Sequence, residues 1–132
     1  MSSPRKATKA TGALAADVAC VLVFCAIGRR SHAEGVTAAG VLDTAWPFLT
    51  GTAAGWLVAR AWRNPASWRT GLAVWVGAIV VGMLLRKATG AGTAVSFVVV
   101  ASLVTATLLL GWRAAAAVLA RRSAAAPSAN PT

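Results

Sequence analysis

The first apolar run of the chain, residues 13–28, reads ALAADVACVLVFCAIG. Further apolar runs lie at about residues 44–61, 71–85 and 93–112, and the second has an alternative start near Thr37. Each run is close to the ~20 residues that an α-helix needs to cross a hydrocarbon core about 30 Å thick. The sequence therefore predicts an all-α, polytopic membrane protein with four transmembrane helices.

The composition supports a membrane setting. Hydrophobic residues make up 58% of the 132 residues and charged residues only 12%, against about 25% charged in soluble domains. A chain this short buries a limited share of its surface in a soluble fold, so lipid must cover the excess. The net charge is +10, but no recognition helix or stacking aromatic pattern accompanies it, so we expect no nucleic-acid partner. Contact with anionic lipid headgroups is the better interpretation.

The distribution of basic residues predicts the orientation. Nine would lie on one side of the membrane: Arg5, Lys6, Lys9, Arg60, Arg63, Arg69, Arg113, Arg121 and Arg122. Four would lie on the other: Arg29, Arg30, Arg86 and Lys87. The positive-inside rule places the nine, and with them both termini, in the cytoplasm.

The apolar runs also divide the chain into segments. Residues 1–12 form an expected disordered basic tail, 13–113 the four-helix membrane domain, and 114–132 an Ala-rich extension that stays helical to about Arg122 before a disordered end. Tryptophans near run ends are typical of membrane interfaces: Trp46, Trp62, Trp68 and Trp112. Trp56 and Trp75 fall inside runs, so we expect them to pack between helices.

Asp17 is the most informative position because it is an acid inside an apolar run. An ionised carboxylate at the centre of a membrane helix costs about 2.5–3.5 kcal/mol, which makes such a residue a candidate for function. One interpretation is a coupling acid that holds a proton or a cation. The other is structural, with the charge stabilised by the helix N-terminus and by Arg or Lys of the tail. Arg29 lies about 18 Å away along a helix, so any membrane-embedded partner must come from another helix.

Basic residues at the predicted outer end oppose the positive-inside preference. They lie near a glycine-rich turn at residues 90–93, and guanidinium groups with backbone N–H groups suit a phosphate, a carboxylate or a lipid headgroup. The alternative is that these cations merely cap helix C-termini. The candidate anion or headgroup site comprises Arg29, Arg30, Ser31, His32, Arg86 and Lys87.

Small residues four apart predict close helix packing. Gly51, Gly55 and Ala59 form such a stripe, and Gly82 offers a similar surface in the third run. The partner helix could belong to this chain or to another protomer. Pro47 lies four residues after Asp43, where it predicts either a kink or the entry turn of the second helix.

The residues offer little for catalysis. There are three acids and one histidine in the whole chain, and no nucleophile–base set or phosphate loop appears among them. Cys20 and Cys25 would point about 140° apart on a helix, so they cannot form a disulfide with each other and suit packing. We expect no enzyme activity, no cofactor and no metal.

Several strings resemble DUF3054, a bacterial and archaeal membrane family. They are V-x-V-F-C-A-I-G-R-R-S-H at 21–32, T-A-W-P-F at 44–48, G-M-L-L-R at 82–86, G-x-G-T-A-x-S-F at 90–97 and L-G-W-R at 110–113. The resemblance covers about residues 13–113 and implies four membrane helices in the cytoplasmic membrane, without an established activity. Its pattern positions are Asp17, Gly28, Arg29, Ser31, His32, Pro47, Phe48, Arg86, Ser96 and Phe97.

Two functions remain open at this point. The first is a homo-oligomeric transporter or channel-like protein for a small solute, an ion or an anionic lipid, because four short helices enclose too little space for a pore. The second is a non-catalytic accessory subunit of a larger membrane complex, packed through Gly51, Gly55 and Ala59. A membrane enzyme acting on lipid ranks behind both.

Overall fold

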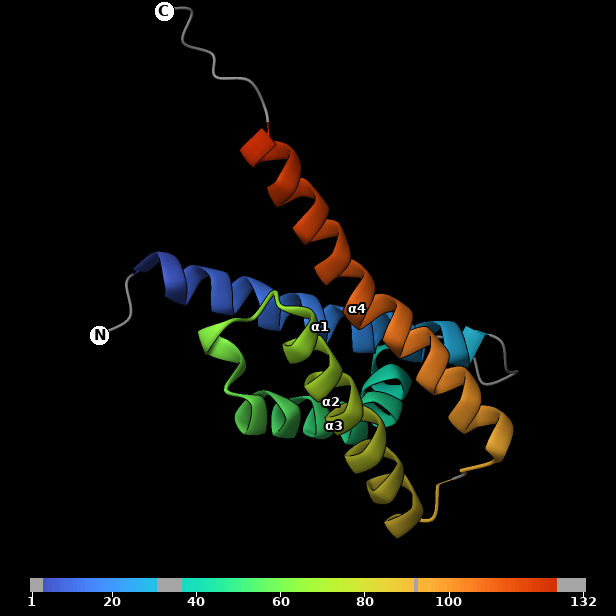
Figure 1. Ribbon diagram of the computed structural model, residues 1–132. Coiled ribbons are helices and arrows are strands. Elements are labelled where there is room, and N and C mark those ends of the chain that lie inside the picture. Colours follow the sequence, from blue (N-terminus) through green and yellow to red (C-terminus); the bar gives the residue numbers. More distant parts are fainter. Residues whose placement is uncertain (1–3, 31–36, 92, 126–132) are drawn as a thin grey trace, which may run out of the picture.

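The computed structural model describes residues 4–30, 37–91 and 93–125. All regular structure in these residues is helical, which confirms the all-α part of the predicted fold class. The elements are α1 (Pro4–Arg30), α2 (Ala38–Ala59), the short 3-10 turn η1 (Ala61–Arg63), α3 (Trp68–Ala88) and α4 (Val95–Ala125), as Figure 1 shows.

Three helices are long and apolar enough to cross a membrane. These spans are Ala7–Arg29 in α1, Trp68–Ala88 in α3 and Val95–Ala124 in α4. The fourth helix, α2, is not among them, although its 22 residues extend about 33 Å at 1.5 Å per residue. Several of its Gly, Thr, Trp and Pro residues are buried within the fold, among them Pro47, Gly51 and Trp56.

The first and last helices, α1 and α4, extend beyond the apolar runs of the sequence. The disordered tail predicted for residues 1–12 is wrong for residues 4–12, because α1 begins at Pro4. Proline is pre-organised for the first helical position, and the Ala, Lys and Arg residues that follow favour helix without any apolar pattern. At the other end α4 continues unbroken to Ala125, slightly beyond the predicted end of the helical extension near Arg122; the end predicted to be disordered lies largely outside the described residues.

Local capping defines the α2–α3 hairpin. Thr37 caps α2, its side chain accepting a hydrogen bond from the Gly40 N–H at 3.0 Å. Arg60 ends α2 in the left-handed conformation, with φ of 51°. Ser67 then caps α3 by accepting from the Thr70 N–H at 3.1 Å. Pro47 lies well inside α2, so it does not form the entry turn of that helix.

Glycines bring α2 and α3 into backbone contact. A methyl group on Gly51 would lie 2.5 Å from the carbonyl oxygen of Gly77, and one on Gly55 would lie 2.8 Å from the Val74 Cα. Across the same interface, a methyl group on Gly82 would lie 2.6 Å from the Phe48 ring. The small-residue stripe therefore packs against a helix of the same chain.

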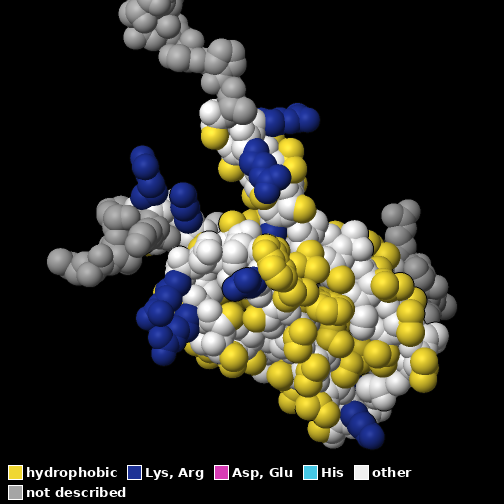
Figure 2. All heavy atoms as spheres, viewed as in Figure 1, with side chains coloured by type: hydrophobic (Ala, Val, Ile, Leu, Met, Phe, Trp, Pro, Cys, Tyr) yellow, Lys and Arg dark blue, Asp and Glu magenta, His cyan; other side chains and the backbone are white. Residues whose placement is uncertain are grey.

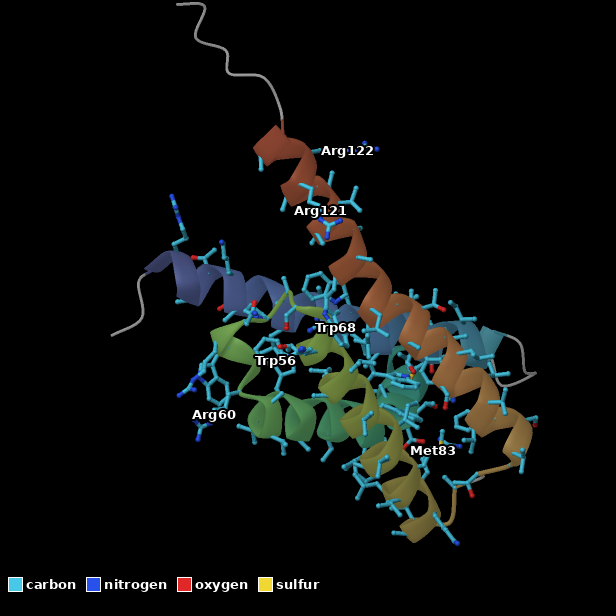
Figure 3. All side chains as sticks on the ribbon, in the orientation of Figure 1. Trp56, Arg60, Trp68, Met83, Arg121 and Arg122 are labelled. Carbon is cyan, nitrogen blue, oxygen red and sulfur yellow. The ribbon has the colours of Figure 1, made fainter. Side chains whose placement is uncertain are left out.

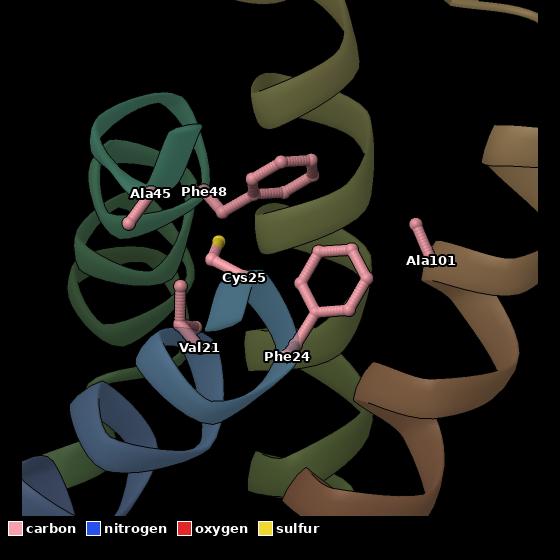
Figure 4. Packing of buried hydrophobic residues seen from close by; sticks show 6 residues of the cluster. All are labelled: Val21, Phe24, Cys25, Ala45, Phe48 and Ala101. Carbon is pink, nitrogen blue, oxygen red and sulfur yellow. The ribbon is translucent and has the colours of Figure 1, made fainter. Parts of the chain in front are cut away.

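An aromatic cluster joins α1, α2 and α4 near the α3–α4 connection. Phe24 and Phe48 meet edge to face with centroids 5.4 Å apart, and Phe97 lies 6.4 and 6.3 Å from them. Figure 4 shows Phe24 and Phe48 pointing into the same space beside Cys25. Both Cys20 and Cys25 are free thiols, as their spacing predicts.

Basic side chains gather at one end of the bundle. Figure 2 shows them where α1 begins, where α2 connects to α3 and where α4 ends. The described and exposed members of this group are Arg5, Lys9, Arg60, Arg63, Arg69, Arg121 and Arg122. The chain thus has a strongly basic end opposite the aromatic cluster.

We expect Gly51→Ala to lower the free energy of unfolding by about 1–3 kcal/mol, because the added methyl group forces α2 and α3 apart. The matched control is Gly111→Ala, where a methyl group meets nothing within 4 Å; it should gain about 0.5–1 kcal/mol from helix propensity. Unfolding in detergent micelles, followed by circular dichroism, measures both. Equal effects of the two substitutions would contradict the backbone contact.

Candidate functional site

The acid in the first helix is held by an arginine in the last. Asp17 is 0% exposed and Arg113 is 2% exposed. Nη1 of Arg113 donates to Oδ1 of Asp17 and Nη2 donates to Oδ2, both at 2.8 Å. The pair is therefore bidentate, the geometry in which guanidinium and carboxylate groups bind each other most specifically.

Two indole groups complete the shell around the carboxylate. Nε1 of Trp56, on α2, donates to Oδ2 of Asp17 at 2.8 Å. Nε1 of Trp112, on α4, donates to Oδ1 at the same distance. Figure 3 places Trp56 inside the bundle, whereas Arg121 and Arg122 project from the extension of α4. Each carboxylate oxygen thus accepts two hydrogen bonds.

The guanidinium group has further partners. Its Nε donates to the Pro65 carbonyl at 2.9 Å, and Nη1 donates to the Leu109 carbonyl at 3.0 Å. Its Cζ lies 4.5 Å from the Trp112 ring centroid, within the range of a cation–π contact. The helix α3 contributes Gly71, where a methyl group would lie 2.8 Å from Cδ of Arg113. Every helix of the bundle therefore contacts the ion pair or its shell.

Hydrogen bonding makes this burial tolerable. Among the described residues, no buried side-chain nitrogen or oxygen atom lacks a hydrogen-bond partner. A buried charge is costly unless it is both paired and hydrogen-bonded, and here both conditions are met. The site can hold the helices together as a closed pair, or present a carboxylate and a guanidinium when α1 and α4 separate.

The structure corrects the sequence-based view of this site. Asp17 lies more than three turns from the start of α1, so neither the helix N-terminus nor a tail residue is its partner. The partner does come from another helix, as expected. Arg113, counted among the nine cytoplasmic basic residues, is buried. Trp112, expected in the interfacial belt, is a hydrogen-bond donor to the acid.

The positions of Asp17 and Arg113 relative to the ends of their apolar runs are the sequence signal that could have predicted this ion pair. Asp17 lies four residues inside its run, and Arg113 directly follows the fourth run. If both ends of the chain face the same side, the two residues lie at depths that differ by less than two helical turns. Trp56, near the end of the second run, falls in the same layer.

The residues of the predicted outer anion site are only partly brought together. Arg29 donates to the Thr44 hydroxyl at 3.5 Å, whereas the guanidinium of Arg86 lies 4.4 Å from the Phe97 ring centroid. The two arginines thus lie against α2 and α4 respectively, and Lys87 is exposed. Ser31, His32 and the side chain of Arg30 lie outside the described part of the chain. The site stays a prediction.

The predicted packing residues lie at or near helix contacts within the chain. Gly51, Gly55 and Gly82 contact neighbouring helices of the same chain, and Ala59 is half-buried at the end of α2. Within residues 4–30, 37–91 and 93–125, no group of three His, Cys, Asp or Glu side chains is placed to hold a metal ion.

Comparison with known proteins gives a family. The sequence profile of a family described as a protein of unknown function, DUF3054, matches residues 14–116. The chain belongs to the DUF3054 family. The match includes Asp17, Trp56, Trp112 and Arg113, so the complete ion-pair shell of this DUF3054 protein lies within the family region. No curated protein and no solved structure matches the chain.

We expect Asp17→Asn or Arg113→Gln alone to lower the free energy of unfolding of this DUF3054 protein by roughly 3–5 kcal/mol, because each leaves an uncompensated buried charge. The double variant should lose much less than the sum of the two. Unfolding in detergent micelles measures this double-mutant cycle. Asp43→Asn, at an exposed acid, is the control and should change stability by less than about 0.5 kcal/mol. Additive losses would contradict a direct pair.

Proposed function

We propose that this protein crosses the bacterial cytoplasmic membrane four times, with both ends in the cytoplasm, and transports a small solute, an ion or an anionic lipid as a homo-oligomer. The observation that carries the proposal is the Asp17–Arg113 pair. Ionisable residues at membrane depth are expensive and commonly mark substrate or ion pathways. This pair joins the first helix to the last, so movement of α1 away from α4 would break the ion pair.

The pair offers a simple transport chemistry. When it is closed, each charge neutralises the other and four hydrogen bonds satisfy the carboxylate. When α1 and α4 separate, the carboxylate can bind a cation or a proton and the guanidinium can bind an anion. A solute that binds Asp17 or Arg113 would therefore replace the contact between them. The free energies of the solute-bound and the closed states would then differ little.

The four-span orientation is supported by charge and by packing. The exposed cations cluster where α1 begins and α4 ends, together with the α2–α3 connection (Figure 2). The positive-inside rule assigns that end to the cytoplasm. The backbone contact of α2 with α3 would shield the glycines of α2 from lipid.

The small space that the helices enclose favours the proposal of a homo-oligomer. Aromatic rings and glycine contacts fill the centre of the bundle. Large apolar side chains are exposed along α4, among them Val99, Val100 and Leu103, and a second copy could cover them to complete a pathway. The accessory-subunit alternative loses its predicted surface, because α3 already covers Gly51 and Gly55.

We expect purified protein in liposomes to pass a small ion or solute, and we expect the Asp17→Asn/Arg113→Gln variant to reduce that flux at least tenfold. The double variant is chosen because it keeps no uncompensated charge and should remain folded. Arg86→Ala tests the predicted outer site in the same assay, with Asp43→Asn and Arg121→Ala as controls that should transport normally.

Unchanged flux in both the double variant and Arg86→Ala would end the transport proposal. So would a strictly monomeric protein by light scattering in mild detergent. A stoichiometric heterologous partner in a mild-detergent pull-down would favour the accessory-subunit alternative instead.

The orientation has its own test. In cysteine-free protein, single cysteines at Lys9, Arg63 and Arg121 should react with a membrane-impermeant maleimide only after the cells are opened, because all three positions belong to the basic end. A cysteine at Lys87 should react in intact cells. Labelling of position 63 in intact cells would show that α2 does not cross the membrane.

A further inference from the structure

A pocket opens at the basic end, next to the buried ion pair. Its volume is about 520 Å³, and α1, the α2–α3 connection and α4 all line it. The side chains that define its chemistry are Lys9, Trp62, Arg63, Asn64 and Trp112. No acidic residue is among its lining residues. It therefore combines two cations with two large aromatic rings.

The two cations have no carboxylate to neutralise them within the described chain. Only two acids are described there, Asp17 and Asp43. Asp17 is bound by Arg113 and by two indoles, and Asp43 belongs to α2 near its opposite end. The pocket thus keeps an uncompensated positive charge, which favours an anionic ligand.

The remaining lining favours a lipid headgroup over a free anion. Gly12, Ala13, Ala66 and Ala116 make much of the wall apolar, and Trp62 is 46% exposed at its edge. Tryptophan rings are typical of the headgroup level of a membrane. Basic pockets between membrane helices on the cytoplasmic side suit anionic phospholipid headgroups, with the phosphate at the cations and the start of the acyl chains against the apolar wall.

The pocket also shares its wall with the ion-pair shell. Pro65 lines it, and the Pro65 carbonyl accepts a hydrogen bond from Nε of Arg113 at 2.9 Å. Trp112 lines it too, and its indole donates to Asp17 at 2.8 Å. A headgroup in the pocket would therefore contact two residues that hold the pair closed.

We infer that this pocket is a binding site for an anionic phospholipid of the cytoplasmic leaflet, with Lys9 and Arg63 binding its phosphate. The inference rests on the orientation in the proposed function but not on transport. Binding would stabilise the closed arrangement of α1, the α2–α3 connection and α4, because one ligand contacts all three.

The test titrates the full-length protein in detergent with short-chain phosphatidylglycerol and follows binding by native mass spectrometry. Zwitterionic phosphatidylcholine and inorganic phosphate serve as the two comparison ligands. Lys9→Gln/Arg63→Gln should weaken phosphatidylglycerol binding about tenfold, since each cation near a headgroup contributes appreciably to its affinity. The control is Arg121→Gln/Arg122→Gln, which removes the same charge from the same end but away from the pocket, and should change affinity by less than about twofold.

Each outcome decides the matter. Tight binding of phosphatidylglycerol that only the pocket variant weakens supports the inference. Equal binding of phosphatidylcholine, equal binding of inorganic phosphate, or equal losses in both variants would overturn it. Because no flux is measured, phosphatidylglycerol binding can hold while transport fails, and the reverse can also occur.

Discussion

A carboxylate and a guanidinium that neutralise each other inside the helix bundle constrain the rest of this DUF3054 protein. Neither group is tolerable alone at that depth, so the first and last helices have to meet there. The indoles of Trp56 and Trp112 satisfy the remaining lone pairs, which brings α2 to the same point. Gly71 of α3 leaves room for the arginine stem. One charge pair therefore determines how all four helices converge.

The sequence predicts the positions of the four helices well, and the ends of α1 and α4 poorly. Each helix contains one of the apolar runs, which are the strongest signal in the sequence. The beginning of α1 at Pro4 and the continuation of α4 to Ala125 lie beyond those runs, where local propensity decides. Asp17 stands out because it violates the apolar pattern. Its partner does not, since Arg113 follows a run directly and resembles an ordinary interfacial arginine.

The two ends of the bundle use cations differently. At the end with the aromatic cluster, Arg29 contacts a hydroxyl of α2 and Arg86 stacks on Phe97. At the opposite end, Lys9, Arg63, Arg121 and Arg122 are exposed. Arginines that lie against a neighbouring helix contribute to packing there. The exposed cations of the basic end are available to anionic groups.

The glycine contact between α2 and α3 has a consequence for motion. Two helices whose backbones touch at Gly51, Gly55 and Gly77 cannot slide or rotate past each other without a steric clash. The α2–α3 hairpin is consequently expected to move as one rigid body. The helices α1 and α4 meet it largely through side chains, and rotamers can rearrange there without strain in the main chain. Any conformational change in this molecule is therefore expected to move α1 and α4 relative to a fixed α2–α3 hairpin.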